Sequence, residues 1–108
     1  MEQFSCPYLG KDVELTDERE EHIENRHPTL IQDYLERLAQ TIAEPDKIHR
    51  SQQNSNTRLF CRFYDDFQRR KYVIVIVRSD LEPVERSWIV TAYRARNLPK
   101  GKVLWTRS

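Results

Sequence analysis

The stretch that decides the fold of this chain is Tyr72-Val73-Ile74-Val75-Ile76-Val77. Successive side chains of a strand point to opposite faces, so both faces of this segment are apolar. Continuous β-branched residues of this kind are typical of a central strand that is buried on both sides.

Further strands are expected on either side of it. Residues 58–64 alternate, with Leu59, Cys61 and Phe63 on one face, and residues 86–95 form another strand. A short strand is expected around Ile48 and an edge strand at 103–105.

Pro45 marks the point where helical spacing gives way to alternation. Before it, apolar residues fall on one helical stripe, which predicts a helix over 29–43 that Thr29 and Gln32 begin with a capping-box pattern. The stripe consists of Leu30, Ile31, Tyr34, Leu35, Leu38, Ala39 and Ile42. An earlier helix is expected over 17–26, capped by Thr16 and ended by the approach to Pro28.

These elements predict a single α+β domain over 1–108, in which two N-terminal helices are followed by three to five antiparallel strands. Residues 1–15 are expected to form an N-terminal hairpin or extension. The expected core includes Leu35, Leu38, Ile42, Leu59, Val75 and Val90.

The net charge of +1 conceals two halves of opposite sign. Residues 1–46 carry four basic and twelve acidic side chains, whereas residues 47–108 carry fourteen basic and five acidic ones. A basic half suits a polyanionic partner such as RNA, although the two halves could also pack against each other. Cys6 and Cys61 lack a CxxC partner, and no apolar stretch approaches the ~20 residues of a membrane span. A cytoplasmic protein without a signal peptide is the simplest expectation.

Two of the three histidines, His22 and His27, lie at the end of the first helix with Arg26 between them. Histidine suits proton transfer near neutral pH, so His22 and His27 are candidate acid–base groups and Arg26 a candidate phosphate ligand. The structural alternative is that His22 lies on the helix rim and His27 belongs to the turn. A metal site is less favoured, because a five-residue spacing does not place both imidazoles on one helix face. No cofactor is expected.

The strands offer candidate RNA-binding groups. Arg58, Phe60, Arg62 and Tyr64 share one face of their strand, and alternating guanidinium and aromatic groups can bind phosphates and stack on bases. In 86–95, strict alternation places Ile89, Thr91, Tyr93 and Ala95 on one face, so that two hydroxyl groups lie together. Both patterns also occur in ordinary strands.

Four segments together resemble the phage and bacterial branch of the barnase–EndoU–colicin–RelE (BECR) nuclease-like superfamily: His22-Ile23-x-x-Arg26-His27-Pro28, Pro45-Asp46, the strand from Tyr72 to Val77 and Trp88-Ile89-Val90-Thr91-Ala92-Tyr93. The resemblance implies two N-terminal helices packed on a four-stranded, or possibly five-stranded, antiparallel sheet, with an active site on the open face of the sheet. It also implies metal-independent RNA cleavage, in which a 2′-hydroxyl attacks the adjacent phosphate. His22 would be the general acid or base, and Thr91 and Tyr93 would contact the phosphate and nucleoside.

The favoured function is therefore a small ribonuclease, a toxin or a phage-associated effector, with an antitoxin or immunity protein as a further expected partner. A non-catalytic RNA- or protein-binding module on the same fold is the main alternative. A third is a homodimer in which the acidic half of one copy meets the basic half of another.

Overall fold

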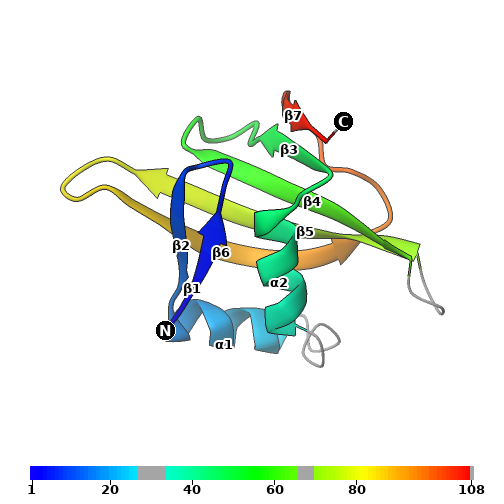
Figure 1. Cartoon of the computed structure of the whole chain (residues 1–108). Helices are drawn as coiled ribbons and strands as arrows, with labels where there is room; N and C mark the ends of the chain where they lie inside the picture. Colours follow the sequence, from blue (N-terminus) through cyan, green and yellow to red (C-terminus); the bar gives the residue numbers. More distant parts are fainter. Residues whose placement is uncertain (27–33, 66–69, 108) are drawn as a thin grey trace.

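The computed structural model describes residues 1–26, 34–65 and 70–107 (Figure 1). Two helices and seven strands are present in these ranges. In chain order they are β1 (Glu2–Cys6), β2 (Lys11–Leu15), α1 (Asp17–Arg26), α2 (Tyr34–Ala43), β3 (Lys47–Arg50), β4 (Thr57–Asp65), β5 (Arg70–Asp80), β6 (Arg86–Ala95) and β7 (Val103–Thr106). The expected helix over 17–26 and the strand over 86–95 are confirmed. The expected start of the second helix at Thr29 lies outside the described residues.

All seven strands form one sheet, in the order β1-β2-β6-β5-β4-β3-β7. The prediction of four or five antiparallel strands following two N-terminal helices is wrong. The N-terminal segment expected to be a hairpin or extension supplies two strands of the sheet, and β2 pairs with β6 in parallel at Glu14 and Trp88. The sheet is therefore mixed, and its first two strands precede the helices in the chain. The pairing of β2 with β6, which is distant in sequence, joins the hairpin to the sheet.

One face of the sheet, called the helix face below, is covered by the helices and the β1–β2 hairpin (Figure 1). Figure 1 shows the hairpin and α2 in front of the long strands, with α1 running along the β6 side. At the tip of the hairpin, the ring of Tyr8 meets that of Phe60 edge-on, with centroids 6.2 Å apart. The core on this face includes Val13, Leu15, Ile23, Leu38, Ile42, Phe60, Val75 and Ile89. Burial of this apolar surface is the main force that holds the three covering elements in place.

The opposite face, called the open face below, carries a smaller apolar cluster of Leu59, Cys61 and Ile74. Tyr93 and Leu98 pack against this cluster. Leu98 comes from the segment that follows β6, so part of the C-terminal region reaches this side of the sheet.

Most of the expected core is confirmed, but two members are wrong. Leu38, Ile42, Leu59 and Val75 are buried, whereas Leu35 is 37% exposed. Val90 is only half-buried, and its position explains the error. Ile89 pairs with Val77 and Thr91 pairs with Ile76, so Val90 is an extra residue in β6, a β-bulge.

The bulge also changes the faces of β6. Strict alternation would place Ile89 with Thr91 and Tyr93, but Ile89 belongs to the helix-face core together with Ala92. Tyr93 packs on the open face, and Thr91 pairs with Ile76, which lies in the open-face cluster. Because Val90 is an extra residue, Ile89 lies on the helix face, whereas Thr91 and Tyr93 lie on the open face.

Candidate functional site

Helix α1 carries His22 at the rim of the core. The Oγ1 of Thr16 accepts a hydrogen bond from the backbone N–H of Arg19 at 3.2 Å, which confirms Thr16 as the cap. Ile23 is fully buried, His22 beside it is half-buried, and Arg26 at the end of the helix is exposed. A half-buried histidine on a packed helix is held in place by its neighbours and still reaches solvent.

One hydrogen bond connects this helix to the backbone of β6. The guanidinium of Arg19, three residues before His22, donates from Nη1 to the carbonyl oxygen of Val90 at 3.3 Å. Residues three apart in a helix lie on the same side, so His22 lies one turn along the helix from this contact. Val90 directly precedes Thr91. The helix that carries His22 is therefore anchored at the backbone next to Thr91.

Thr91 and Tyr93 are half-buried on the open face. Burial, and to a smaller extent the Cys61 thiol, raises the pKa of the Tyr93 hydroxyl above its ordinary value. Tyr93 therefore keeps its proton at neutral pH and can donate a hydrogen bond. His22 and Tyr93 are presented from different sides of β6, since Ile23 enters the helix-face core and Tyr93 packs on the open face.

The face of β4 predicted to bind RNA lies on the helix side of the sheet. Phe60 is fully buried, so its ring belongs to the core rather than to a surface where a base could stack. Arg62 donates to the carbonyl oxygen of Glu44 at 2.5 Å, and its guanidinium lies 5.8 Å from the ring centroid of Tyr64. Arg58 is half-buried on the same face. The alternation in this strand was read correctly, but the helices cover the face that was expected to be free.

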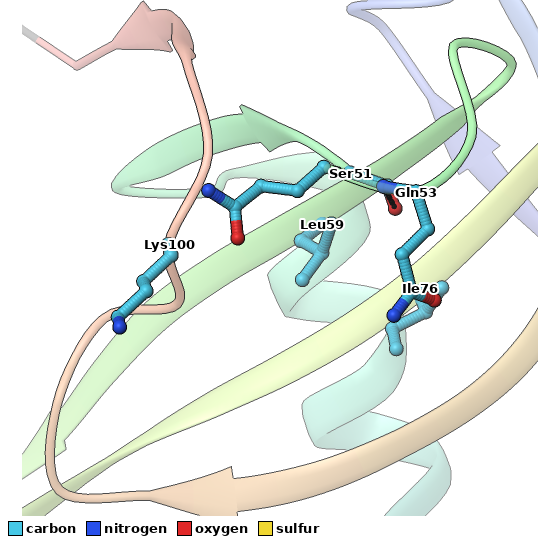
Figure 2. Close-up of a pocket in the computed structure, with 6 residues that line it drawn as sticks. Ser51, Gln53, Leu59, Ile76 and Lys100 are labelled. Carbon is cyan, nitrogen blue, oxygen red and sulfur yellow. Dashed lines mark hydrogen bonds between the residues drawn. The ribbon is translucent and has the colours of Figure 1, made fainter.

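The open face contains a small pocket of about 240 Å³ (Figure 2). Leu59 and Ile76 form its floor, with Ser51 and Gln53 on one side and Lys100 on the other. Figure 2 shows α2 behind the sheet, so the pocket opens away from the helices.

His49, the third histidine, lies on strand β3 of the sheet and was not among the residues predicted to form the site. It is 5% exposed, and neither ring nitrogen has a hydrogen-bond partner in the described part of the chain. It pairs with Leu59, the residue in the floor of the pocket. Because β3 and β6 are three strands apart, His49 lies ~14 Å from Thr91 and cannot act on the same phosphate. The only feature of the sequence that could have indicated this position for His49 was the short strand expected around Ile48.

The remaining expectations concern His27, the two cysteines, metal binding and membrane-spanning helices. His27 lies outside the described residues. Cys6 and Cys61 are free and buried. Within residues 1–26, 34–65 and 70–107, no group of three or more His, Cys, Asp or Glu side chains is arranged to hold a metal ion. No helix in these ranges is long and apolar enough to cross a membrane.

Comparison with protein families identifies the relatives of this fold. Residues 6–106 match the model of the family described as phage-Barnase-EndoU-ColicinE5/D-RelE like nuclease2. The chain belongs to this family. The match confirms the resemblance read from the histidine helix and the Thr91–Tyr93 strand, and it includes β7 and all of α1 and α2. No match was found among the curated proteins or among the solved structures.

Membership of this nuclease-like family supports a nuclease domain of phage-related type. The family model covers the segments that carry His22, Thr91 and Tyr93, but it assigns no role to any of them.

Proposed function

We propose that this domain is an endoribonuclease that cleaves RNA by attack of a ribose 2′-hydroxyl on the adjacent phosphate. The observation that carries the proposal is the hydrogen bond from Arg19 to Val90, in a chain of a nuclease-like family. This contact anchors the helix that carries His22 beside the strand that carries Thr91. A group able to transfer a proton and a hydroxyl able to bind phosphate thus belong to neighbouring elements.

The reaction requires two proton transfers. A base takes the proton of the 2′-hydroxyl as its oxygen bonds to phosphorus, and an acid gives a proton to the departing 5′ oxygen. The products are a 2′,3′-cyclic phosphate and a free 5′-hydroxyl, with no water consumed. His22 is the proposed acid or base, and His27, just beyond α1, is the proposed partner for the second transfer.

The remaining groups stabilise the negative charge of the phosphate and position the RNA. Arg26, exposed at the end of α1, is the proposed ligand of the phosphate that gains negative charge in the transition state. Thr91 and Tyr93, on the open face, donate hydrogen bonds to the RNA backbone, which must pass around β6 to reach His22 on the other side. Arg58 and Arg62 contribute positive charge to the surroundings, whereas the burial of Phe60 removes it from this set.

Cleavage of a mixed-sequence RNA, with detection of cyclic-phosphate ends, tests the proposal. His22→Ala should slow cleavage by about 10²–10⁴-fold, the usual cost of losing an acid–base group. Thr91→Val keeps the shape of the side chain but removes its hydroxyl, and should also slow cleavage. Glu24→Ala changes an exposed residue of the same helix and should leave the rate unchanged. EDTA should have no effect, because the mechanism uses no metal ion.

Two results would overturn the proposal: a wild-type protein that cuts no RNA under any condition, or a folded His22→Ala variant that cuts at the wild-type rate. The second candidate function, an RNA-binding module without catalysis, would then be preferred. The packing of Tyr93 against Leu59, Cys61 and Ile74 favours that candidate, since it gives the tyrosine a purely structural reason to be there.

We further propose that the enzyme acts as a toxin or a phage-associated effector and has a protein inhibitor. Co-expression provides the test, because an active toxin should arrest bacterial growth and His22→Ala should restore it.

A further inference from the structure

A second hollow, of about 420 Å³, lies where the start of α1 meets the start of β6. Its lining consists of Thr16, Glu18, Arg19, Arg86 and Trp88. The volume lies within the ~300–1,000 Å³ range of small-molecule sites, so one nucleoside would fit. None of the site residues predicted from the sequence lines this hollow.

Trp88 provides a fixed aromatic surface in the hollow. Its indole Nε1 donates to Oδ2 of Asp80 at 3.4 Å, and the guanidinium carbon of Arg86 lies 5.3 Å from the centre of its ring. Arg86 is itself oriented, because its Nε donates to Oε2 of Glu14 at 3.1 Å. A half-buried indole with an ordered guanidinium over its face is a surface on which a nucleobase can stack.

The charges of the hollow favour a base over a phosphate. Arg19 is paired with the carboxylate of Glu18 at 3.0 Å, and Arg86 is paired with Glu14. Two cations and two anions leave no excess positive charge for a phosphate. The same groups offer both donors and acceptors, which match the hydrogen-bonding edge of a nucleobase.

The hollow lies beside the proposed catalytic strand residues. Trp88 pairs with Arg78, in the position next to the Val77–Ile89 pair of the helix face, so its side chain lies on the open-face side like Thr91. Trp88 and Thr91 are three positions apart in the strand, at most ~10 Å along it. Arg19 also belongs to both places, because it lines the hollow and binds the carbonyl oxygen of Val90.

We propose that this hollow binds a nucleobase of single-stranded RNA, next to the phosphate held at Thr91, by stacking on Trp88 and Arg86. The inference rests on the proposed function for its choice of RNA. Glu18 and Arg19 at the rim form hydrogen bonds to the edge of the base and give the site its base preference.

The test uses a single-stranded oligonucleotide with 2′-O-methyl riboses, which cannot be cleaved because the attacking hydroxyl is blocked. The chain has two tryptophans, so Trp105→Phe leaves Trp88 as the only indole. In that background the oligonucleotide should quench tryptophan fluorescence in a saturable way. For variants that lack Trp88, binding is followed by the fluorescence anisotropy of a dye-labelled oligonucleotide, and Trp88→Leu should weaken it by about tenfold or more, as expected for loss of one base-stacking side chain. Trp88→Phe keeps an aromatic face and should retain most of the affinity.

Matched variants separate stacking from net charge. Arg86→Ala removes a positive charge at the start of β6 and Arg96→Ala removes one just after its end, and both arginines are exposed. The first should weaken binding much more than the second. Glu18→Gln should change which bases are preferred, measured with homopolymeric oligonucleotides of the four bases.

The outcomes distinguish this inference from the proposed function. If wild type cleaves RNA but the oligonucleotide does not quench Trp88, the site is not in this hollow. If Trp88→Leu and Arg86→Ala bind as well as the Arg96→Ala control, the inference is likewise overturned. Quenching of Trp88 without any cleavage of RNA would support the base site and reject the enzyme.

Discussion

Arg19 of helix α1 binds the one extra residue of strand β6: its Nη1 lies 3.3 Å from the carbonyl oxygen of Val90. A bulge leaves part of a strand backbone without a regular partner, and here a helix supplies one. The contact joins the helix of His22 to the strand of Thr91.

Arg19→Met should separate the structural and functional roles of this contact. Methionine keeps much of the apolar stem but cannot donate to Val90. We expect the free energy of unfolding to fall by only about 1 kcal/mol, since the hydrogen bond is partly exposed. The rate of RNA cleavage should fall more steeply, because His22 loses its fixed position. Urea denaturation and a cleavage assay measure the two effects, with Arg50→Met, an exposed arginine of β3, as the control. An unchanged cleavage rate in a less stable Arg19→Met protein would mean that the contact serves the fold alone.

Alkaline pH should destabilise the protein through Cys61. Burial, and then the charge of Asp46, raises the pKa of this thiol from 9.0 to about 12. The unfolded state therefore loses the thiol proton first, and stability falls as pH rises from 9 toward 12. Cys61→Ala should flatten this part of the profile, measured by urea denaturation at several pH values. A wild-type stability that is constant between pH 8 and 11 would contradict this assignment. The free thiols should also react slowly with iodoacetamide at pH 8 until urea is added, because both are buried.

The hydroxyl of Tyr64 should stabilise the packing of α2 on β4. It lies 3.0 Å from Oε1 of Gln40, 3.2 Å from Oγ1 of Thr41 and 3.3 Å from the carbonyl oxygen of Arg37. Tyr64→Phe removes one oxygen and leaves these groups partly unsatisfied, so it should lower the free energy of unfolding by about 1–2 kcal/mol. Tyr8→Phe is the matched control, because Tyr8 is 40% exposed and its ring contact with Phe60 is kept. Equal stability of the two variants in urea would refute the expectation.

The two glycines should respond very differently to alanine. Gly101 has a φ of +125°, and an added Cβ would clash with the carbonyl oxygen of Arg50. Gly101→Ala should therefore displace the segment that leads into β7 and break the hydrogen bond from Arg50 N–H to the Lys102 carbonyl. Gly10 has a φ of +70° but no atom within 4 Å of an added Cβ, so Gly10→Ala should cost only about 1–2 kcal/mol of backbone strain. Thermal unfolding should show a lower melting temperature for Gly101→Ala than for Gly10→Ala. A red shift of Trp105 fluorescence in Gly101→Ala alone would locate the change at β7. Equal melting temperatures would show that the connection to β7 relaxes freely.

Part of the candidate site was readable from the sequence and part was not. The helix with His22 at its rim follows from the cap at Thr16 and the buried Ile23, and the family follows from the histidine segment together with Thr91 and Tyr93. The free face of β4 was predicted wrongly. Both faces of that strand carry apolar side chains. Alternation shows which side chains share a face, but it does not show which face the helices cover. The fully buried ring of Phe60 shows the outcome.

The sequence by itself determined the local elements and the family, because spacing, capping and strand propensity act over a few residues. The tertiary structure alone decided three further features. The first is the parallel pairing of Glu14 with Trp88, which brings the N-terminal hairpin into the sheet. The second is the bulge at Val90, which moves Ile89 away from the face of Thr91 and Tyr93. The third is the hollow between Arg19, Arg86 and Trp88. The first and third depend on contacts between segments about 70 residues apart, and the bulge depends on the pairing of β6 with β5. The energies of these contacts come from the assembled domain and leave no periodic signal in the chain.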